Sequence, residues 1–267
     1  MGSRQEAGRI VGEVAGLGPA ELASAPGAVV APRPARLRVL SMIERRAAGE
    51  PLQYVLGSWG FRRLDLFVDA RVLIPRPETE QVVEVALREL AALPGARTVV
   101  DLGTGSGAIA LSLAVEVPSV EVWATDVSEA ALEVARANLS GLAGRAATRV
   151  RVTAGAWFDA LPPALAGQVD LIVSNPPYVG AAETLPPEVA DWEPATALVA
   201  GPTGLEAVEQ ILAGAGRWLR RPGTLVLEIA PHQAGPAVAL AARLGYETDV
   251  RPDLAGRDRA LVGRLAR

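Results

Sequence analysis

Three glycines follow an apolar run in the segment 99–108, which reads Val-Val-Asp-Leu-Gly-Thr-Gly-Ser-Gly-Ala. Glycine lets the backbone turn sharply and approach a ligand closely, and a helix that begins here offers unpaired amide groups in its first turn. Asp126 stands 19 residues beyond Gly107, at the end of a second predicted strand. An acid at that place can accept hydrogen bonds from both ribose hydroxyls. The pattern therefore predicts a nucleoside site, with a tight turn and a helix-capping aspartate as the alternative.

A second motif, Ser174-Asn175-Pro176-Pro177-Tyr178, follows the apolar run 169–173. The Asn175 side-chain oxygen and the Pro176 carbonyl can accept hydrogen bonds from both N–H groups of a planar NH2 group, and the prolines hold the backbone in place. Tyr178 can stack on the same planar group. The motif predicts a methyl-acceptor site that acts through positioning and electrostatics, with an ordinary strand-ending turn as the alternative.

The glycine loop alone does not identify its nucleoside. The spacing Gly103-x-Gly105-x-x-Ala108 also satisfies the degenerate dinucleotide fingerprint, and Asp126 suits NAD equally well. Asp101 favours S-adenosylmethionine, because a carboxylate directly before the glycines can contact a positively charged sulfonium amino acid. The acceptor motif favours it too, although adenine N6 and a glutamine amide both present the planar NH2 group that this motif suits.

These motifs need a scaffold of alternating strands and helices. Helical spacing is seen in the first 50 residues, where Leu37, Leu40 and Ile43 are one example, and a turn or linker is predicted from Ala25 to Pro34. Alternation at 55–74 predicts a β-hairpin. Further strands are predicted at 98–102, 121–125, 149–153, 169–174, 223–229, 246–251 and 260–264, with helices between most of them. This order predicts a parallel, doubly wound α/β sheet, with a helical N-terminal domain (1–50), a hairpin linker (51–77) and an α/β domain (78–267).

The composition excludes several kinds of chemistry. Cysteine is absent, and His232 is the one histidine, so disulfides, thiolate metal sites and multi-histidine metal centres are ruled out. All 26 basic residues are arginine, which removes a P-loop or Schiff-base lysine. We therefore expect no metal. No uncharged run approaches the ~20 residues of a membrane span, and no signal peptide is visible, so we expect a soluble, cytoplasmic protein.

The net charge is −4, and it is distributed unevenly between two parts of the chain, residues 1–80 and 81–267. Neither part of the chain shows the basic surface that duplex nucleic acid requires, so no such binding is expected. A local cluster of Arg33, Arg36, Arg38, Arg45 and Arg46 against Glu44 could meet an acidic partner surface. We therefore interpret the N-terminal domain as a substrate-recognition domain.

Taken together, the motifs resemble the HemK/PrmC family of protein-(glutamine-N5) methyltransferases that act on peptide chain release factors. The resemblance covers nearly the full chain. It rests on 45–51 with Tyr54, Gly57 and Phe61, on Leu-Ile-Pro-Arg-Pro-Glu-Thr-Glu at 73–80, on 101–108, on Trp157-Phe158, on 175–178, on Trp192-Glu193-Pro194 with Ala197-Leu198, and on 256–259.

The resemblance implies a seven-stranded class I methyltransferase (Rossmann-like) fold and, as substrate, the glutamine of a Gly-Gly-Gln loop. The expected S-adenosylmethionine-binding residues, which would also hold the product S-adenosylhomocysteine, are Asp101, Gly103, Thr104, Gly105, Ser106, Gly107, Asp126, Trp157 and Asn175. The expected substrate-binding residues are Asn175, Pro176, Pro177 and Tyr178, together with Arg76 and Glu78, whose segment is expected to wall the pocket. Asn175, Pro176 and Tyr178 are the expected catalytic residues.

One departure from the family pattern concerns the adenine. Ala156 precedes Trp157 where an acid is common, so a contact from that acid to the adenine amino group is not expected here, whereas stacking by Trp157 is unaffected. Trp157 also has plain core packing as an alternative. Alternative functions are methylation of a ribosomal-protein glutamine, adenine-N6 methylation of nucleic acid, an NAD-dependent oxidoreductase, and a non-catalytic adaptor.

Overall fold

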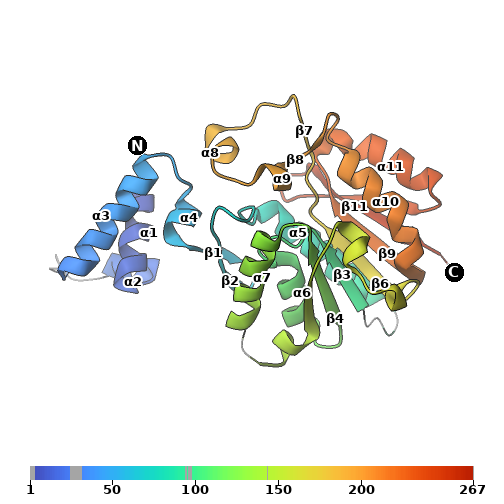
Figure 1. Ribbon diagram of the computed structural model, residues 1–267, viewed down its shortest axis with the longest axis horizontal. Helices are drawn as coiled ribbons and strands as arrows, with labels where there is room; N and C mark the ends of the chain where they lie inside the picture. Colours follow the sequence, from blue (N-terminus) through green and yellow to red (C-terminus); the bar gives the residue numbers. More distant parts are fainter. Residues whose placement is uncertain (1–3, 25–31, 94, 96–97, 143, 267) are drawn as a thin grey trace.

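The computed structural model describes residues 4–24, 32–93, 95, 98–142 and 144–266. Helices α1 (Arg4–Ala15), α2 (Pro19–Ser24) and α3 (Arg33–Ala47) form the blue N-terminal lobe of Figure 1. The short helix α4 (Leu52–Leu56) joins them through a small cluster of Ile10, Met42 and Val55. Of the predicted linker 25–34, residues 25–31 lie outside the described residues. Its predicted end is too late, because α3 already begins at Arg33, with Pro34 in its first turn.

The lobe is followed by the predicted hairpin. Strands β1 (Ser58–Phe61) and β2 (Leu64–Phe67) pair antiparallel, with Ser58 opposite Phe67. The hydroxyl of Tyr54 on α4 donates a 2.5 Å hydrogen bond to the carbonyl of Val72. This bond ties α4 to the segment that leads from the hairpin into α5 (Pro77–Ala92).

A seven-stranded sheet forms the centre of the larger domain, and its strand order is β10-β11-β9-β6-β3-β4-β5 (Figure 1). The chain runs outward through three strands from the centre, then returns to the other side of the first of them. The order therefore reverses between β3 and β6, which is where open α/β sheets bind ligands at the carboxyl ends of their strands. The strands are β3 (Thr98–Leu102), β4 (Glu121–Asp126), β5 (Val150–Ala154), β6 (Val169–Ser174), β9 (Leu219–Glu228), β10 (Glu247–Pro252) and β11 (Asp258–Leu265).

The predicted seven-stranded, doubly wound sheet is confirmed, and one of its strands departs from the parallel arrangement. Strand β11 pairs antiparallel with both β9 and β10, so the sheet is mixed. The reason is the length of the connection, because a parallel return requires a crossover of a dozen or more residues. Only five residues separate β10 from β11, which is enough for a hairpin turn and too few for a crossover.

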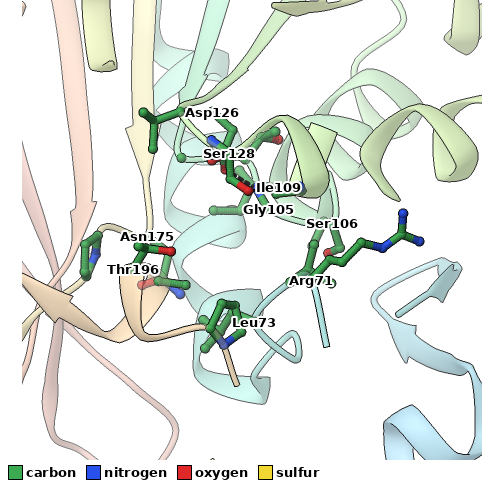
Figure 2. A pocket seen from close by; sticks show the side chains of 18 of the residues that line it. Arg71, Leu73, Gly105, Ser106, Ile109, Asp126, Ser128, Asn175 and Thr196 are labelled. Carbon is green, nitrogen blue, oxygen red and sulfur yellow. Dashed lines mark hydrogen bonds between the residues drawn. The ribbon is translucent and has the colours of Figure 1, made fainter. Parts of the chain in front are cut away.

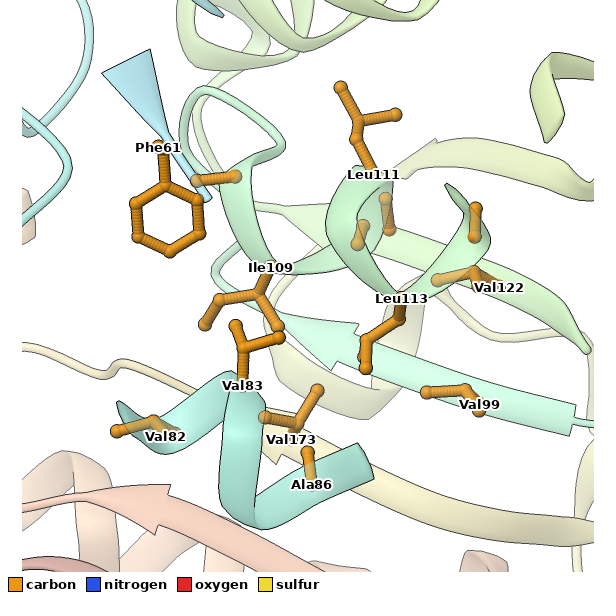
Figure 3. Packing of buried hydrophobic residues seen from close by; sticks show 14 of the residues in the cluster. Phe61, Val82, Val83, Ala86, Val99, Ile109, Leu111, Leu113, Val122 and Val173 are labelled. Carbon is orange, nitrogen blue, oxygen red and sulfur yellow. The ribbon is translucent and has the colours of Figure 1, made fainter. Parts of the chain in front are cut away.

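Helices cover both faces of the sheet. Val99 and Val100 are neighbours on β3 yet belong to different hydrophobic clusters, because successive side chains of a strand point to opposite faces. Val99 packs with residues of α5 and α6 such as Val83 and Ile109 (Figure 3). Val100 packs with residues of the helices on the other face. The covering helices are α5, α6 (Ala108–Glu116) and α7 (Glu129–Gly141) on one face, and α10 (Glu206–Trp218) and α11 (Ala234–Arg243) on the other.

Shorter elements complete the chain. Between β6 and α10 it passes through β7 (Val179–Gly180), α8 (Pro187–Ala190), α9 (Ala195–Leu198) and β8 (Val199–Gly201), and β7 pairs with β8. Short 3-10 helices lie at Gly144–Arg149, Trp157–Ala160, Pro163–Leu165 and Pro231–Gln233. Among the described residues, no helix combines the length and apolar character needed to cross a membrane.

Candidate active site

The glycine loop connects β3 to α6 in the way that the sequence predicts. Gly103 and Gly105 have φ of 69° and 55°, in the left-handed region that a side chain disfavours. A Cβ at Gly107 would lie 3.1 Å from Leu111 of the following helix, so this last glycine also permits close packing. The loop thus exposes backbone rather than side chains toward the space in front of it.

Asp101 supports this loop from beneath. Its carboxylate is fully buried and accepts hydrogen bonds from the Thr104 hydroxyl (2.7 Å) and the Ala110 nitrogen (3.1 Å). Burial disfavours the charged form and raises the pKa of Asp101 to about 7. Asp101 does not line the cavity described below, so the expected contact with a sulfonium amino acid stays a prediction.

Asp126 ends β4 beside the loop. One of its carboxylate oxygens accepts a hydrogen bond from the Gly105 nitrogen and the other from the Ser128 nitrogen, both at 2.9 Å. Burial raises its pKa above the ordinary value. The carboxylate is held in one orientation at the edge of the loop, as a ribose-binding acid requires.

A cavity of about 330 Å³ opens in front of these residues (Figure 2). This volume lies within the range of small-molecule sites. Of the predicted cofactor residues, the wall contains Gly103, Thr104, Gly105, Ser106, Asp126 and Trp157. Asn175 and Pro177 of the acceptor motif line it as well. The predicted residues that do not line it are Asp101, Gly107, Pro176, Tyr178, Arg76 and Glu78.

Trp157 lines the cavity and has an unusual backbone conformation. Its φ is 46°, which is uncommon for a bulky residue. The indole nitrogen donates to the Gln210 side chain (2.8 Å), and a Cβ at Gly103 would lie 3.7 Å from the ring. One side of the indole therefore contacts the glycine loop, and the neighbouring Ala156 also lines the cavity.

Asn175 reaches the cavity from the strand next to the glycine loop. Leu102 and Ser174 are register partners on β3 and β6, and the Ser174 hydroxyl donates to the Leu102 carbonyl (2.6 Å). The residues that follow them, Gly103 and Asn175, therefore emerge side by side. The Asn175 nitrogen donates to the Thr79 hydroxyl (3.2 Å), while its oxygen is buried and has no hydrogen-bond partner among the described residues.

Tyr178 ends the acceptor motif and does not line the cavity. Its carbonyl accepts a hydrogen bond from Gln233 (2.9 Å). Burial raises the pKa of the Tyr178 hydroxyl to about 12, and the nearby charge of Glu228 acts in the same direction. The expected stacking role of Tyr178 stays a prediction.

Arg76 and Glu78 lie at the beginning of α5, outside the cavity wall. Arg76 forms an ion pair with the buried Glu193, and Glu78 is 3.2 Å from Arg257. The segment they belong to does contribute to the wall, through Leu73, Pro75 and Thr79. Their predicted contact with the substrate stays a prediction.

Sequence reasoning gave no site role to part of the wall. Pro194, Thr196 and Ala197 line it from the excursion between β6 and α10, and Arg71 lines it from the segment before α5. The resemblance singled out 192–194 and Ala197, which was the available signal. Nothing in the composition around Arg71 indicates a site.

The site fits S-adenosylmethionine. A turned backbone loop, an acid at the end of the next strand and a half-buried indole surround one cavity, and Asn175, whose side-chain oxygen has no hydrogen-bond partner among the described residues, lines it as well. Among the residues that the structure describes, no group of three metal-ligating side chains comes together.

The fold and the site define a class I S-adenosylmethionine-dependent methyltransferase. A solved methyltransferase from Pyrococcus furiosus has the same fold, with a TM-score of 0.56 at 18% identity over 87% of this chain and 98% of that one. The family model "Methyltransferase small domain" matches residues 81–189, and the "PrmC N-terminal domain" matches residues 2–57.

Curated relatives place the chain more narrowly. A release factor glutamine methyltransferase of Gloeobacter violaceus is 47% identical over 84% of this chain and 78% of its own length. One of Deinococcus radiodurans is 43% identical over 87% and 81%. The chain belongs to the release factor glutamine methyltransferase family.

Proposed function

We propose that this protein transfers a methyl group from S-adenosylmethionine to the side-chain amide nitrogen of the glutamine in the Gly-Gly-Gln loop of peptide chain release factors. The observation that carries the proposal is the Asn175 amide, whose oxygen is buried without a partner on the wall shared with the glycine loop. A buried acceptor without a donor is costly, and an incoming amide N–H would satisfy it.

The protein's part in the reaction is positioning. Asn175 and the Pro176 carbonyl accept the two N–H groups of the glutamine amide, and Tyr178 stacks on its plane. S-adenosylmethionine supplies an electrophilic methyl group, so a nitrogen–carbon bond forms as the sulfur–carbon bond breaks. The chain needs no general base, because the alkylated amide nitrogen is acidic and releases its proton to water. Since release factors act at ribosomes, the proposal places the reaction in the cytoplasm.

Labelled S-adenosylmethionine, purified release factors and ribosomal proteins test the proposal when the labelled peptides are mapped by mass spectrometry. We expect one labelled residue, the Gly-Gly-Gln glutamine, and no label in a release factor whose glutamine is replaced by alanine. Label confined to a ribosomal-protein glutamine or to nucleic acid would contradict the proposal.

A further inference from the structure

A hydrogen-bond chain runs from the acceptor motif into the core of the protein. The Asn175 nitrogen donates to the Thr79 hydroxyl at 3.2 Å, and that hydroxyl donates to a Glu228 carboxylate oxygen at 2.7 Å. The three residues come from the loop after β6, the first turn of α5 and the end of β9. Glu228 is fully buried, and Thr79 is nearly so.

The direction in which these two hydrogen bonds are donated decides whether the Asn175 side chain offers its oxygen or its nitrogen to a ligand. A threonine hydroxyl has one hydrogen, and here it is donated to Glu228. Its oxygen can then only accept, so the part of the Asn175 amide that faces Thr79 must be the NH2 group. The Asn175 oxygen is thereby turned away from Thr79 and left free to accept.

We propose that Thr79 and Glu228 are positioning residues that fix the orientation of the Asn175 amide, so that its oxygen and not its nitrogen meets the methyl acceptor. This inference rests on the proposed function, in which Asn175 accepts a hydrogen bond from the acceptor NH2 group. Neither Thr79 nor Glu228 transfers a proton to the substrate.

The negative charge of Glu228 keeps the Thr79 hydroxyl donating toward Glu228, and so keeps the Asn175 NH2 group facing Thr79. Burial raises the pKa of Glu228 to about 7, against the hydrogen bond from Thr79 and the nearby Arg259. Arg259 lies 4.0 Å from the second Glu228 oxygen. A protonated Glu228 donates to Thr79, whose hydrogen then points to Asn175 and reverses the amide. The charged or titratable groups that face Glu228 from the surrounding elements are Arg259, Arg76, Glu78 and Tyr178.

Three variants of the chain test the inference in the full-length protein with a Gly-Gly-Gln peptide. Thr79→Val removes the hydroxyl and is expected to lower kcat roughly a hundredfold, whereas Thr79→Ser restores the hydroxyl and most of the rate. Glu228→Gln is expected to lower kcat too, because its oxygen turns toward Arg259 and its NH2 group toward Thr79. Thr224→Val makes the same change at another buried threonine of β9 and is the matched control, with kcat near that of the wild type.

The pH profile gives a reading that a merely structural role would not change. Wild-type kcat is expected to fall as the pH drops through about 7, since protonation of Glu228 reverses the chain. The Glu228→Gln variant should lack this step. A wild-type kcat in Thr79→Val, equal losses in Thr79→Val and Thr79→Ser, or an unchanged step in Glu228→Gln would each overturn the inference.

The side-chain NH2 signals of Asn175, measured by nuclear magnetic resonance without substrate, separate this inference from the proposed function. These signals are assigned by their disappearance in Asn175→Asp, which has no side-chain NH2 group. They should shift in Thr79→Val and remain nearly unchanged in Thr79→Ser. They should titrate near pH 7 in the wild type and in Thr79→Ser, and not in Glu228→Gln. If they do so while no glutamine is methylated, the proposed function fails and the positioning chain stands. If they are the same in wild type and Thr79→Val, the positioning chain fails.

Discussion

The buried carboxylate of Glu193 accepts a 3.0 Å hydrogen bond from the backbone nitrogen of Ile74, which stands 119 positions earlier in the chain. The same carboxylate pairs with Arg76. Leu73 and Pro75 on one side of this contact, and Pro194 and Thr196 on the other, line the cavity. Glu193 therefore joins two segments of the cavity wall that are remote in sequence.

Glu193→Ala should loosen this wall. It leaves the buried Ile74 nitrogen without its acceptor, which costs about 1–3 kcal/mol of unfolding free energy, and weakens S-adenosylmethionine binding as well. Urea unfolding and calorimetry measure the two effects. Glu188→Ala breaks the exposed pair with Arg46 and is the control, with an expected loss of less than about 1 kcal/mol. Equal losses in the two variants would contradict the wall contact.

Removal of the Asp126 carboxylate tests the cofactor site. Asp126→Ala should weaken the binding of S-adenosylmethionine by roughly 1.5–3 kcal/mol, the scale of a charged hydrogen bond. Glu129→Ala, an exposed acid at the start of the next helix, is the control. Calorimetry should also show binding of S-adenosylhomocysteine and none of NAD. Tight NAD binding without S-adenosylmethionine binding would show that the site is of another kind.

The sequence predicts those parts of the site that are local. The glycines at 103, 105 and 107 need their own backbone angles. Asp126 is the last residue of β4 and Asn175 directly follows β6, so a strand pattern places both. The strand order makes β3 and β6 neighbours, and the register of Leu102 with Ser174 brings the two loops that follow them together.

Contacts between remote segments could not be predicted in this way. Glu228 reads as the end of an apolar strand, and nothing in the pattern pairs it with Thr79, 149 positions away. Glu193 and Ile74 are a similar case. The exposure of Leu37, Leu40 and Ile43 was also hidden, because helical spacing does not tell whether an apolar stripe is buried.

The pKa of Asp101 makes stability depend on pH. The folded value is about 7, well above the ordinary value, so the folded state binds this proton more tightly than the unfolded chain. The protonated Asp101 therefore adds to the free energy of unfolding. This contribution is complete at about pH 4 and is lost as the pH rises through about 7. Between pH 4 and 8, the free energy of unfolding of the wild type should fall by about 2–4 kcal/mol relative to that of Asp101→Asn. Urea unfolding across this range checks it, with the exposed Asp159→Asn as control, and parallel curves for wild type and Asp101→Asn would refute it.

Tyr178 is expected to act through its ring. Tyr178→Ala should greatly reduce methyl transfer while S-adenosylmethionine affinity stays near that of the wild type, because Tyr178 does not line the cofactor cavity. Tyr178→Phe should be much milder, whereas Asn175→Ala should cost about 10²–10³ in rate. Single-turnover methylation measures all three. If Tyr178→Phe were as inactive as Asn175→Ala, the hydroxyl would be needed and stacking would not explain its role.

The N-terminal lobe offers a surface for the proposed docking of a folded substrate. Two of its five clustered arginines are engaged in ion pairs, Arg45 with Glu50 and Arg46 with Glu6 and Glu188. The more conspicuous feature is apolar, because Leu37 and Leu40 on α3 are 56% and 55% exposed.

Charged residues introduced on this surface should therefore weaken the binding of a whole release factor and leave the binding of a short peptide unchanged. Each of Leu37→Glu and Leu40→Glu is expected to raise the KM for a folded release factor roughly tenfold, the value of a leucine side chain buried in a contact. The KM for a short Gly-Gly-Gln peptide should not change, because the peptide reaches only the cavity. Leu244→Glu, at an exposed leucine that follows α11, is the matched control. Steady-state kinetics with both substrates decides, since equal effects on the two, or no effect on either, would show that α3 has no docking role.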